Sequence, residues 1–250
     1  MKIAIIGSGN GAVTAAVDMV DKGHGVRLYC RNESISKFDV ALEKGGFDFN
    51  NEGEEKFIEF TDISDDIEYV LEDADIVQVI IPASFIEYYA KVMSQYVTNH
   101  HLIFFNIAAS MGSIRFMNVL EDRHIDVHPY FAESNTLTYG TRVDFENARV
   151  DLSLNVRRVF FSTFNRSELN ESYEKVSQIY DHLVKEESLL KTNLENGNPE
   201  VHPGPTLLNV GRIDFAENFS LYSEGITNHT VRLLHCLLYT SPSPRDKRQS

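Results

Sequence analysis

The residues whose types and spacing most clearly predict chemistry form a glycine-rich turn near the start of the chain. In a strand–turn–helix unit the first glycine permits a tight turn, the second lets the backbone approach a pyrophosphate, and a small third residue lets the helix pack on the strand. The free N–H groups of the helix start attract phosphate. An apolar segment at Lys2–Ile6 and an amphipathic one at Ala12–Lys22 supply that context. The turn is predicted to bind NAD(H) or NADP(H) through Gly7, Ser8, Gly9, Asn10, Gly11 and Ala12. The alternative is a turn with a structural role only.

The end of the second apolar segment indicates which dinucleotide is preferred. An acidic residue at this place binds the ribose hydroxyls of NAD, whereas an arginine accommodates the 2′-phosphate of NADP. Here Val26–Cys30 is followed by Arg31 and Asn32, and the first acid is Glu33. A guanidinium binds phosphate through paired, charge-assisted hydrogen bonds. NADP is therefore the preferred predicted cofactor and NAD the alternative, unless Arg31 is an ordinary surface residue.

Pro82 and Ala83 are expected at the rim of the same site. They follow the buried segment Asp75–Ile81, and ligands of open α/β sheets bind at the carboxyl ends of the strands. The sequence contains no spacing typical of a metal site, a P-loop or a nucleophile elbow, so no metal is predicted.

These residues need a scaffold, and short apolar segments alternating with amphipathic ones predict an α/β fold. The expected architecture is a Rossmann-type doubly wound parallel sheet followed by the beginning of a mainly helical second domain. Further strands are expected at 102–106, 125–127 and 158–164, and helices at 63–71, 85–97, 113–121 and 168–184. The stretch 35–60 is expected to be irregular and to contain a hairpin or an extended loop.

The domain organisation is predicted from a change in composition. Residues 1–190 are expected to form the NAD(P)-binding domain and residues 191–235 the start of a helical substrate domain, joined by an Asn-, Gly- and Pro-rich loop at 193–205. Residues 236–250 end in TSPSPRDKRQS and follow an apolar helix without a stop signal. They are expected to be a non-native tail that truncates the second domain.

Composition and charge exclude several classes of function. A net charge of −14 argues against nucleic-acid binding, because no basic stripe is available for phosphates. Hydrophobic residues make up 42% and charged residues 24%, as in a soluble globular protein. No apolar run is long enough to span a membrane, and residues 1–6 do not resemble a signal peptide. With only Cys30 and Cys236 present, a cytoplasmic location is expected.

Five segments in fixed order carry a family resemblance. They are GSGNGA at 7–12, IIPAS at 80–84, AESNTLTYGTR at 132–142, NPEVHPGPTLLNVGRID at 198–214 and YSEGIT at 222–227. Over residues 1–235 the chain resembles the opine dehydrogenases, the octopine/nopaline dehydrogenase family. The resemblance implies an NAD(P)H-dependent oxidoreductase that condenses an amino acid with a 2-oxo acid and reduces the resulting imine. It implies these small molecules as partners, and it leaves open a homodimer of a longer protein.

The resemblance also implies roles for individual residues. His202 corresponds to the catalytic histidine, which suits proton transfer because imidazole titrates near neutral pH; His128 is the competing candidate. Glu133 is either a second catalytic carboxylate or an ordinary loop residue, and Thr136 lies in the same segment. Asn209 and Arg212 share roughly one helical face with His202. Arg212 either pairs with a substrate carboxylate or lies on the surface. These three, Thr136, Asn209 and Arg212, are the predicted substrate-binding residues.

Two other readings compete with this one. A two-domain dehydrogenase of a small ketone or hydroxy acid, of the ketopantoate or glycerol-3-phosphate type, depends on a lysine in the helical domain. No lysine lies between Lys191 and Lys247, which weakens that reading. A catalytically incomplete nucleotide-binding fragment is the third.

Overall fold

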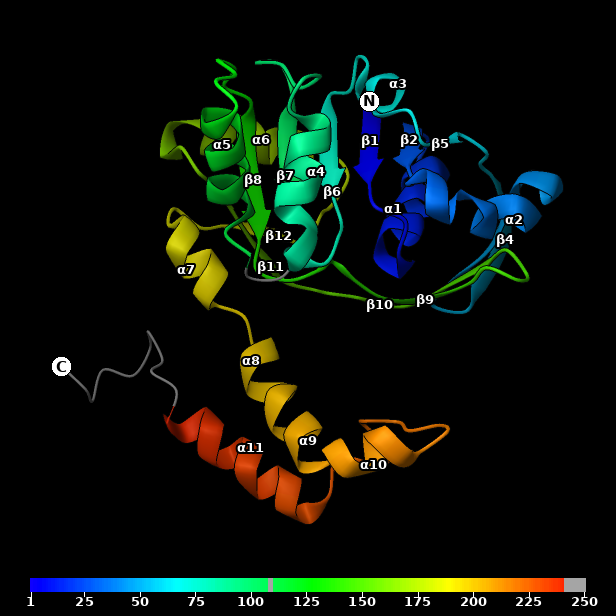
Figure 1. Cartoon of the computed structure of the whole chain (residues 1–250), viewed down its shortest axis with the longest axis vertical. Helices are drawn as coiled ribbons and strands as arrows, with labels where there is room; N and C mark the ends of the chain where they lie inside the picture. The colour runs from blue at the N-terminus through cyan, green and yellow to red at the C-terminus, as the bar shows by residue number, and fades with distance from the viewer. Residues whose placement is uncertain (108–109, 241–250) are drawn as a thin grey trace. The chain divides into compact units, whose positions relative to one another are not determined.

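The computed structural model describes residues 1–107 and 110–240, and for Pro199 and Glu200 the backbone only. The chain divides into two compact units, Met1–Glu195 and Asn196–Ser250 (Figure 1). Of the predicted tail, Cys236–Thr240 continue a helix, whereas residues 241–250 lie outside the described residues. The domain boundary predicted after residue 190 falls within helix α7 (Leu189–Leu194), which contacts strands of the first unit.

The first unit is built on an eight-stranded sheet, sheet A, with the order β12-β11-β8-β7-β6-β1-β2-β5. Neighbouring strands are parallel except β8 and β11, which are antiparallel. The predicted Rossmann-type fold is thus confirmed, with β11 and β12 at one edge running opposite to the other six strands. In chain order the strands are β1 (Lys2–Ile6), β2 (Gly25–Tyr29), β5 (Ile63–Ser64), β6 (Ile76–Val79), β7 (Leu102–Phe105), β8 (Tyr130–Ser134), β11 (Val159–Thr163) and β12 (Leu183–Lys185).

Strand β1 shows how the two faces of sheet A are covered. Successive side chains of a strand point to opposite faces, and Ile3 and Ile5 join one buried cluster while Ala4 and Ile6 join the other. The first cluster includes residues of α1 (Asn10–Asp21) and α6 (Leu169–Val176). The second includes residues of α3 (Ile67–Leu71), α4 (Ile86–Met93) and α5 (Gly112–Asp122). Apolar residues on both faces of β1 therefore place the strand in the centre of the unit (Figure 1).

A second sheet, sheet B, lies against helix α1 and has the order β4-β3-β10-β9. Its strands are β3 (Gly46–Asn51), β4 (Glu54–Glu59), β9 (Tyr139–Asp144) and β10 (Arg149–Asn155). Part of it comes from the stretch expected to be irregular, which also forms a 3-10 helix, η1 (Asn32–Phe38), and α2 (Asp39–Lys44). The hairpin expected within 35–60 is β3–β4.

Two predicted elements were wrong. No strand forms at 125–127, where Ile125 and Val127 are only partly buried; the next strand is β8. The helix expected over 168–184 ends at Val176, and its last residues belong to β12. In this segment the apolar residues near the end pair with β11, and sheet pairing prevails over helical periodicity. Two further 3-10 turns are η2 (Ala83–Phe85) and η3 (Arg166–Glu168).

The second unit is helical over its described part. It contains α8 (Asn198–Val201), α9 (Pro203–Leu208), α10 (Val210–Phe215) and α11 (Asn228–Thr240). Gly204 lets α9 approach α11 closely, because a Cβ at that position would lie 3.0 Å from the Leu233 side chain. Within residues 1–107 and 110–240, every helix is too short or too polar to cross a bilayer.

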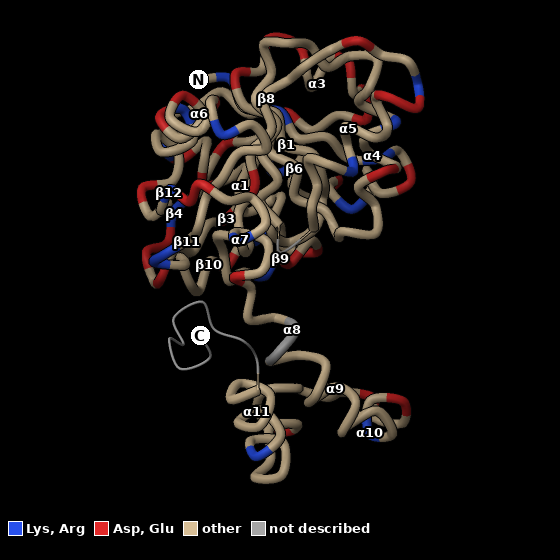
Figure 2. Tube along the Cα trace, turned by 90° about the vertical axis from the view of Figure 1, so that its left-hand side faces the viewer, with Lys and Arg blue, Asp and Glu red and all other residues tan. Residues whose placement is uncertain are grey.

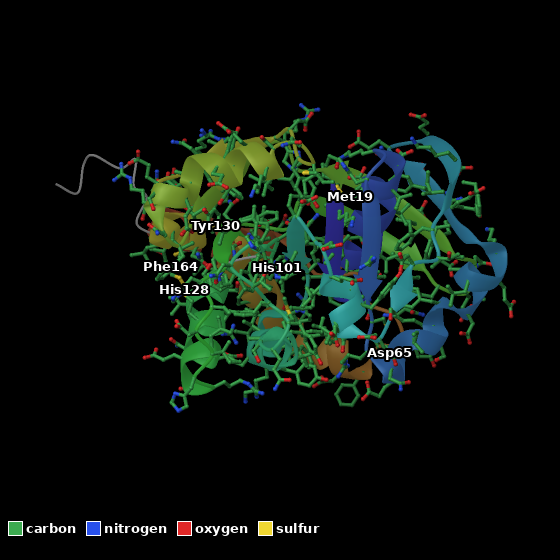
Figure 3. The ribbon with its side chains drawn as sticks, turned by 90° about the horizontal axis from the view of Figure 1, so that it is seen from above. Met19, Asp65, His101, His128, Tyr130 and Phe164 are labelled. Carbon is green, nitrogen blue, oxygen red and sulfur yellow. The ribbon has the colours of Figure 1, made fainter. Side chains whose placement is uncertain are left out.

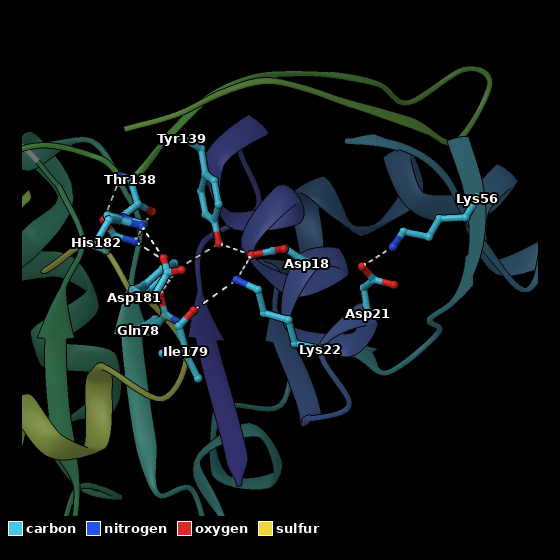
Figure 4. A network of polar contacts seen from close by, with 12 residues as sticks. Asp18, Asp21, Lys22, Lys56, Gln78, Thr138, Tyr139, Ile179, Asp181 and His182 are labelled. Atoms are coloured by element: carbon cyan, nitrogen blue, oxygen red, sulfur yellow. Dashed lines mark hydrogen bonds and ion pairs between the residues drawn. The ribbon is translucent and has the colours of Figure 1, made fainter. Parts of the chain in front are cut away.

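A buried polar network ties sheet B to helix α1 and sheet A (Figure 4). The Tyr139 hydroxyl on β9 donates to Asp18 of α1 at 2.7 Å, and Lys22 donates to the same carboxylate at 2.8 Å. Tyr180 lies 3.2 Å from Tyr139 and donates to Gln78 of β6 at 2.8 Å. Burial is the main cause that raises the pKa of Tyr139 well above its ordinary value, so this hydroxyl stays protonated and serves as a donor.

Removing that donor is expected to destabilise the first unit. Tyr139→Phe leaves the buried Asp18 carboxylate with one hydrogen-bond partner fewer, which costs about 1–3 kcal/mol of unfolding free energy. Tyr69 is a matched control, because its exposed hydroxyl donates to Asp62 at the surface; Tyr69→Phe should cost less than about 0.5 kcal/mol. Urea unfolding followed by circular dichroism measures both. Equal losses for the two variants would contradict a structural role for the network.

Candidate functional site

A pocket of about 610 Å³ lies at the carboxyl ends of β1, β2 and β6. The chain runs from β1 to β2 on one side and later returns to β6 on the other side of β1, so the pocket lies where the strand order reverses. Ligands of open α/β sheets bind at this place. The lining residues are Gly7, Ser8, Gly9, Gly11, Arg31, Ser34, Lys37, Ile80, Ile81, Pro82, Ala83, Phe85, Tyr89, Ile107 and Leu137.

The glycines of the turn differ in what surrounds them. Gly7 has a φ of +129°, and a Cβ there would lie 2.2 Å from the Ile80 carbonyl oxygen. A Cβ at Gly11 would lie 2.9 Å from the Leu137 side chain. A Cβ at Gly9 meets nothing within 4 Å, although Gly9 lines the pocket and precedes α1. Gly7 is thus required by the close backbone approach and by its positive φ, Gly11 lies in tight contact with the end of the Leu137 side chain, and Gly9 keeps space open at the helix start.

Two of the six predicted turn residues do not line this pocket. Ala12 is fully buried, in agreement with close packing of α1 on the sheet. Asn10 begins α1, and Asn32 begins η1; neither is among the lining residues. Pro82 and Ala83 do line the pocket, as the end of β6 leads into it.

One wall of the pocket is cationic and comes from the segment that starts at Arg31. A 3-10 helix has about three residues per turn, so positions three apart share one face. Arg31, which caps η1, and Ser34 and Lys37 within it all line the pocket. Asn32 lies off this face. Lys37 also donates to the Ser8 carbonyl oxygen, and the Arg31 guanidinium lies 5.8 Å from the centres of the Phe85 and Tyr88 rings.

The electrostatics of this wall suit a bound anion. The described lining contains no Asp or Glu, and the described ion pairs include neither Arg31 nor Lys37. Burial lowers the pKa of Lys37, since the ammonium is partly desolvated. Figure 2 shows acidic residues spread around the first unit. In a chain with a net charge of −14, a pocket wall with two cations is unusual and indicates binding of phosphate or carboxylate.

Sequence reasoning missed Ser34 and Lys37. It assigned residues 35–60, which include Lys37, to irregular structure and predicted no element at Ser34, so no common face was considered for the two residues. The spacing of three residues from Arg31 to Ser34 and again to Lys37 was the available signal, but it has meaning only once a 3-10 helix is known.

Glu133 lies away from the pocket surface. Its side chain is buried on β8, and its two carboxylate oxygens accept hydrogen bonds from the Ser113 N–H at 2.8 Å and the Asn193 side chain at 3.0 Å. Thr136 is not a lining residue, and its carbonyl oxygen accepts from Ser134. The next residue, Leu137, reaches the pocket instead.

The predicted residues of the second unit form contacts with one another. His202 Nε2 lies 2.5 Å from the Tyr222 hydroxyl. Asn209 donates to the carbonyl oxygens of Pro205 and Gly225, which indicates a structural role within this unit. Arg212 pairs with Glu224. A histidine whose ring nitrogen bonds a tyrosine hydroxyl can exchange a proton with a ligand through either group.

The competing histidine, His128, is a surface residue (Figure 3). Its side chain is 83% exposed and pairs with Asp126 at 3.2 Å. Within the described part of the chain, no three His, Cys, Asp or Glu residues are grouped to hold a metal ion.

Comparisons with known proteins bear out the predicted resemblance. Residues 185–238 match the family model described as NAD/NADP octopine/nopaline dehydrogenase, alpha-helical domain. The chain is 24% identical over 224 residues to an opine dehydrogenase of Arthrobacter sp. (strain 1C), covering 90% of this chain and 61% of that protein. The chain is therefore similar to the opine dehydrogenases, and it spans about three fifths of the length of this curated protein.

Solved structures share the fold. An octopine dehydrogenase with NADH and L-arginine is 19% identical with a TM-score of 0.70, covering 93% of this chain and 60% of that one. A yersinopine dehydrogenase with bound NADP⁺ is 15% identical with a TM-score of 0.68, covering 89% of this chain and 57% of that one.

The two turn glycines provide a test of the site's architecture. Gly7→Ala is expected to cost at least about 2 kcal/mol of unfolding free energy, because it adds both a clash and a strained φ. Gly9→Ala is expected to change stability by less than about 0.5 kcal/mol, since its Cβ enters open space. Urea unfolding of the two variants measures the difference. A Gly9→Ala variant as unstable as Gly7→Ala would show that the space above Gly9 is not open.

Proposed function

We propose that this relative of the opine dehydrogenases binds NADP(H) in the pocket of the glycine turn and serves an opine-type dehydrogenase reaction. In that reaction an amino acid condenses with a 2-oxo acid, and the condensation product is reduced. The observation that carries the proposal is the pocket itself, in which an open glycine turn faces a cationic wall. The family match of residues 185–238 supports the assignment of the reaction class.

The fit of a dinucleotide rests on the space above Gly9. A pyrophosphate at the start of α1 needs backbone N–H groups that no side chain covers, and a Cβ at Gly9 would occupy that space. Gly7, Ser8, Gly9 and Gly11 are the residues proposed to hold the pyrophosphate, with Pro82 and Ala83 at the rim. When bound, the reduced nicotinamide supplies the hydride.

The preference for NADP over NAD is proposed from the three residues on one face of η1. The 2′-phosphate of NADP carries the charge that distinguishes it from NAD, and Arg31 and Lys37 offer two cationic donors while Ser34 offers a hydroxyl. No acid among the described lining residues is available to bind the ribose hydroxyls of NAD. Relatives with the same fold were solved with NADH and with NADP⁺, so the choice depends on this wall.

His202 is proposed as the group that moves protons during condensation and reduction. Formation of a carbon–nitrogen bond with loss of water requires protons at the carbonyl oxygen and from the amine nitrogen. A Tyr222 hydroxyl that donates to Nε2 leaves the proton of the neutral ring on Nδ1. Tyr222 would thus fix the tautomer of His202. Arg212 binds a substrate carboxylate in this scheme only if Glu224 releases it.

The described helical unit does not favour the alternative reading, a ketone or hydroxy-acid dehydrogenase. That reading requires a lysine, and residues 196–240 contain none. A requirement for both an amine and a 2-oxo acid would distinguish the two reactions, since a ketone reductase oxidises NADPH with the ketone alone.

The cationic wall gives a prediction for cofactor selectivity. Arg31→Ala and Lys37→Met are each expected to weaken NADPH binding about 10- to 100-fold, because each removes a charge-assisted contact with the 2′-phosphate. NADH binding should change less than about threefold in Arg31→Ala, and less than NADPH binding in Lys37→Met, which also loses the contact with the Ser8 carbonyl oxygen. Fluorescence titration of the wild type and of each variant measures the dissociation constants for both nucleotides. Lys44→Met is the control, since Lys44 pairs with Asp48 and does not line the pocket. Equal weakening of NADPH and NADH would refute the 2′-phosphate assignment.

The role of His202 is tested in the complete protein. His202→Ala is expected to lower kcat for NADPH oxidation with an amino acid and pyruvate by about 10²- to 10⁴-fold. Tyr222→Phe should lose less, because the imidazole remains. His128→Ala is the matched control and should retain wild-type turnover. Near-wild-type turnover of His202→Ala would contradict the assignment of His202 as the proton-transfer group.

A further inference from the structure

The buried carboxylate of Glu133 holds two elements together. Only 1% of the residue is exposed, and the described ion pairs give it no cationic partner. One of its oxygens accepts from the N–H of Ser113, the second residue of helix α5, and the other accepts from Asn193 of α7. The α5 start therefore stabilises the buried negative charge. The carboxylate in turn fixes α7.

Asn193 completes this contact from the other side. It is 5% exposed, and its side-chain oxygen accepts from the backbone N–H of Met111 at 3.0 Å. Its nitrogen donates to Glu133. Met111 has a left-handed φ of 48° and caps α5. We call Glu133, Asn193 and Met111 the α7 latch.

The latch is close in sequence to two residues that line the nucleotide pocket. Ile107 precedes Met111 by four residues, and Leu137 follows Glu133 by four. Between Glu133 and Leu137, Asn135 donates to the Glu195 carbonyl oxygen at 2.7 Å, at the end of the first unit. The described segment 133–137 thus joins the pocket rim at Leu137 to the contact that holds residue 195. A ligand that fixes the rim also fixes the latch.

The surroundings of the latch are not fully hydrogen-bonded. Among the described residues, the buried hydroxyls of Ser110, Ser113 and Thr192 find no hydrogen-bond partner. Ser110 and Ser113 flank the Met111–Gly112 turn, and Thr192 adjoins Asn193. Buried polar groups without partners are rare in native structures, and a second arrangement of this segment can gain hydrogen bonds that offset those it breaks.

We infer that filling of the nucleotide pocket stabilises the α7 latch and so fixes the segment at which the chain leaves the nucleotide-binding unit. Glu133 and Asn193 are positioning residues in this account, and Glu133 has no contact with the reacting groups. The inference rests on the proposed binding of NADPH. It follows by reciprocity that a broken latch weakens NADPH binding by the factor by which NADPH tightens the latch.

Hydrogen–deuterium exchange with and without saturating NADPH tests the coupling. In the wild-type chain, NADPH is expected to slow exchange of the amides at 189–195 about fivefold or more, together with those at 7–13. In Asn193→Ala the amides at 189–195 exchange fast in both states, and the dissociation constant for NADPH rises about fivefold. Leu190→Ala is the control on the same helix, because Leu190 is 58% exposed and outside the latch.

If Asn193→Ala fails to fold, a second pair of variants, in which the carboxylate moves from residue 133 to residue 193, still tests the inference. Glu133→Gln leaves one acceptor oxygen for two donors, the Ser113 N–H and the Asn193 amide, and so weakens the latch. Glu133→Gln combined with Asn193→Asp restores a donor and an acceptor and leaves Met111 its acceptor, so much of the NADPH-dependent protection should return. A double variant as unprotected as the single one overturns the inference.

The outcomes separate the inference from the proposed function. Protection at 7–13 without protection at 189–195 shows that NADPH binds and that the latch is not coupled to it. Protection at neither place shows that NADPH does not bind, which refutes the proposed function and the coupling together. Retained coupling in Asn193→Ala overturns the latch alone.

Discussion

The path of the chain between β1 and α1 depends on Gly7, because glycine has no Cβ. The turn passes the end of β6 so closely that any Cβ would meet the Ile80 carbonyl oxygen at 2.2 Å. This contact brings the start of α1 to the point where the sheet order reverses. The buried residues of α1 then pack on β1, and sheet B packs on α1 in turn. The pocket and both layers above the sheet therefore depend on this approach.

The described pocket lining is cationic, whereas the chain as a whole carries a net negative charge. A chain with an excess of acidic residues repels anions in general. Two cations on one face of η1, with no acid in the described lining, create a local exception. The partial burial that lowers the pKa of Lys37 also reduces solvent screening of its charge. This partial burial would strengthen the attraction of the proposed phosphate over that of an exposed lysine.

Part of this site could be predicted from the sequence, and the reasons for success and failure are physical. The glycine turn and Arg31 were found because their roles follow from local backbone geometry next to a strand, which the sequence pattern reveals. Lys37 and Ser34 were missed because their common face exists only in a 3-10 helix, and that helix has no strong sequence signal. The burial of Glu133 was missed for another reason. It depends on contacts with Ser113 and Asn193, which are 20 and 60 residues away in the chain, and one sequence does not reveal such pairing.

The central claim is that the open space above Gly9 is the binding site of a dinucleotide. Calorimetric titration of NADPH into the wild-type chain and into Gly9→Ala tests it most directly. The account predicts saturable binding of one NADPH per wild-type chain, and a loss of at least about 100-fold in affinity for Gly9→Ala. Absence of saturable binding to the wild-type chain, or equal binding by a folded Gly9→Ala variant, would contradict the account.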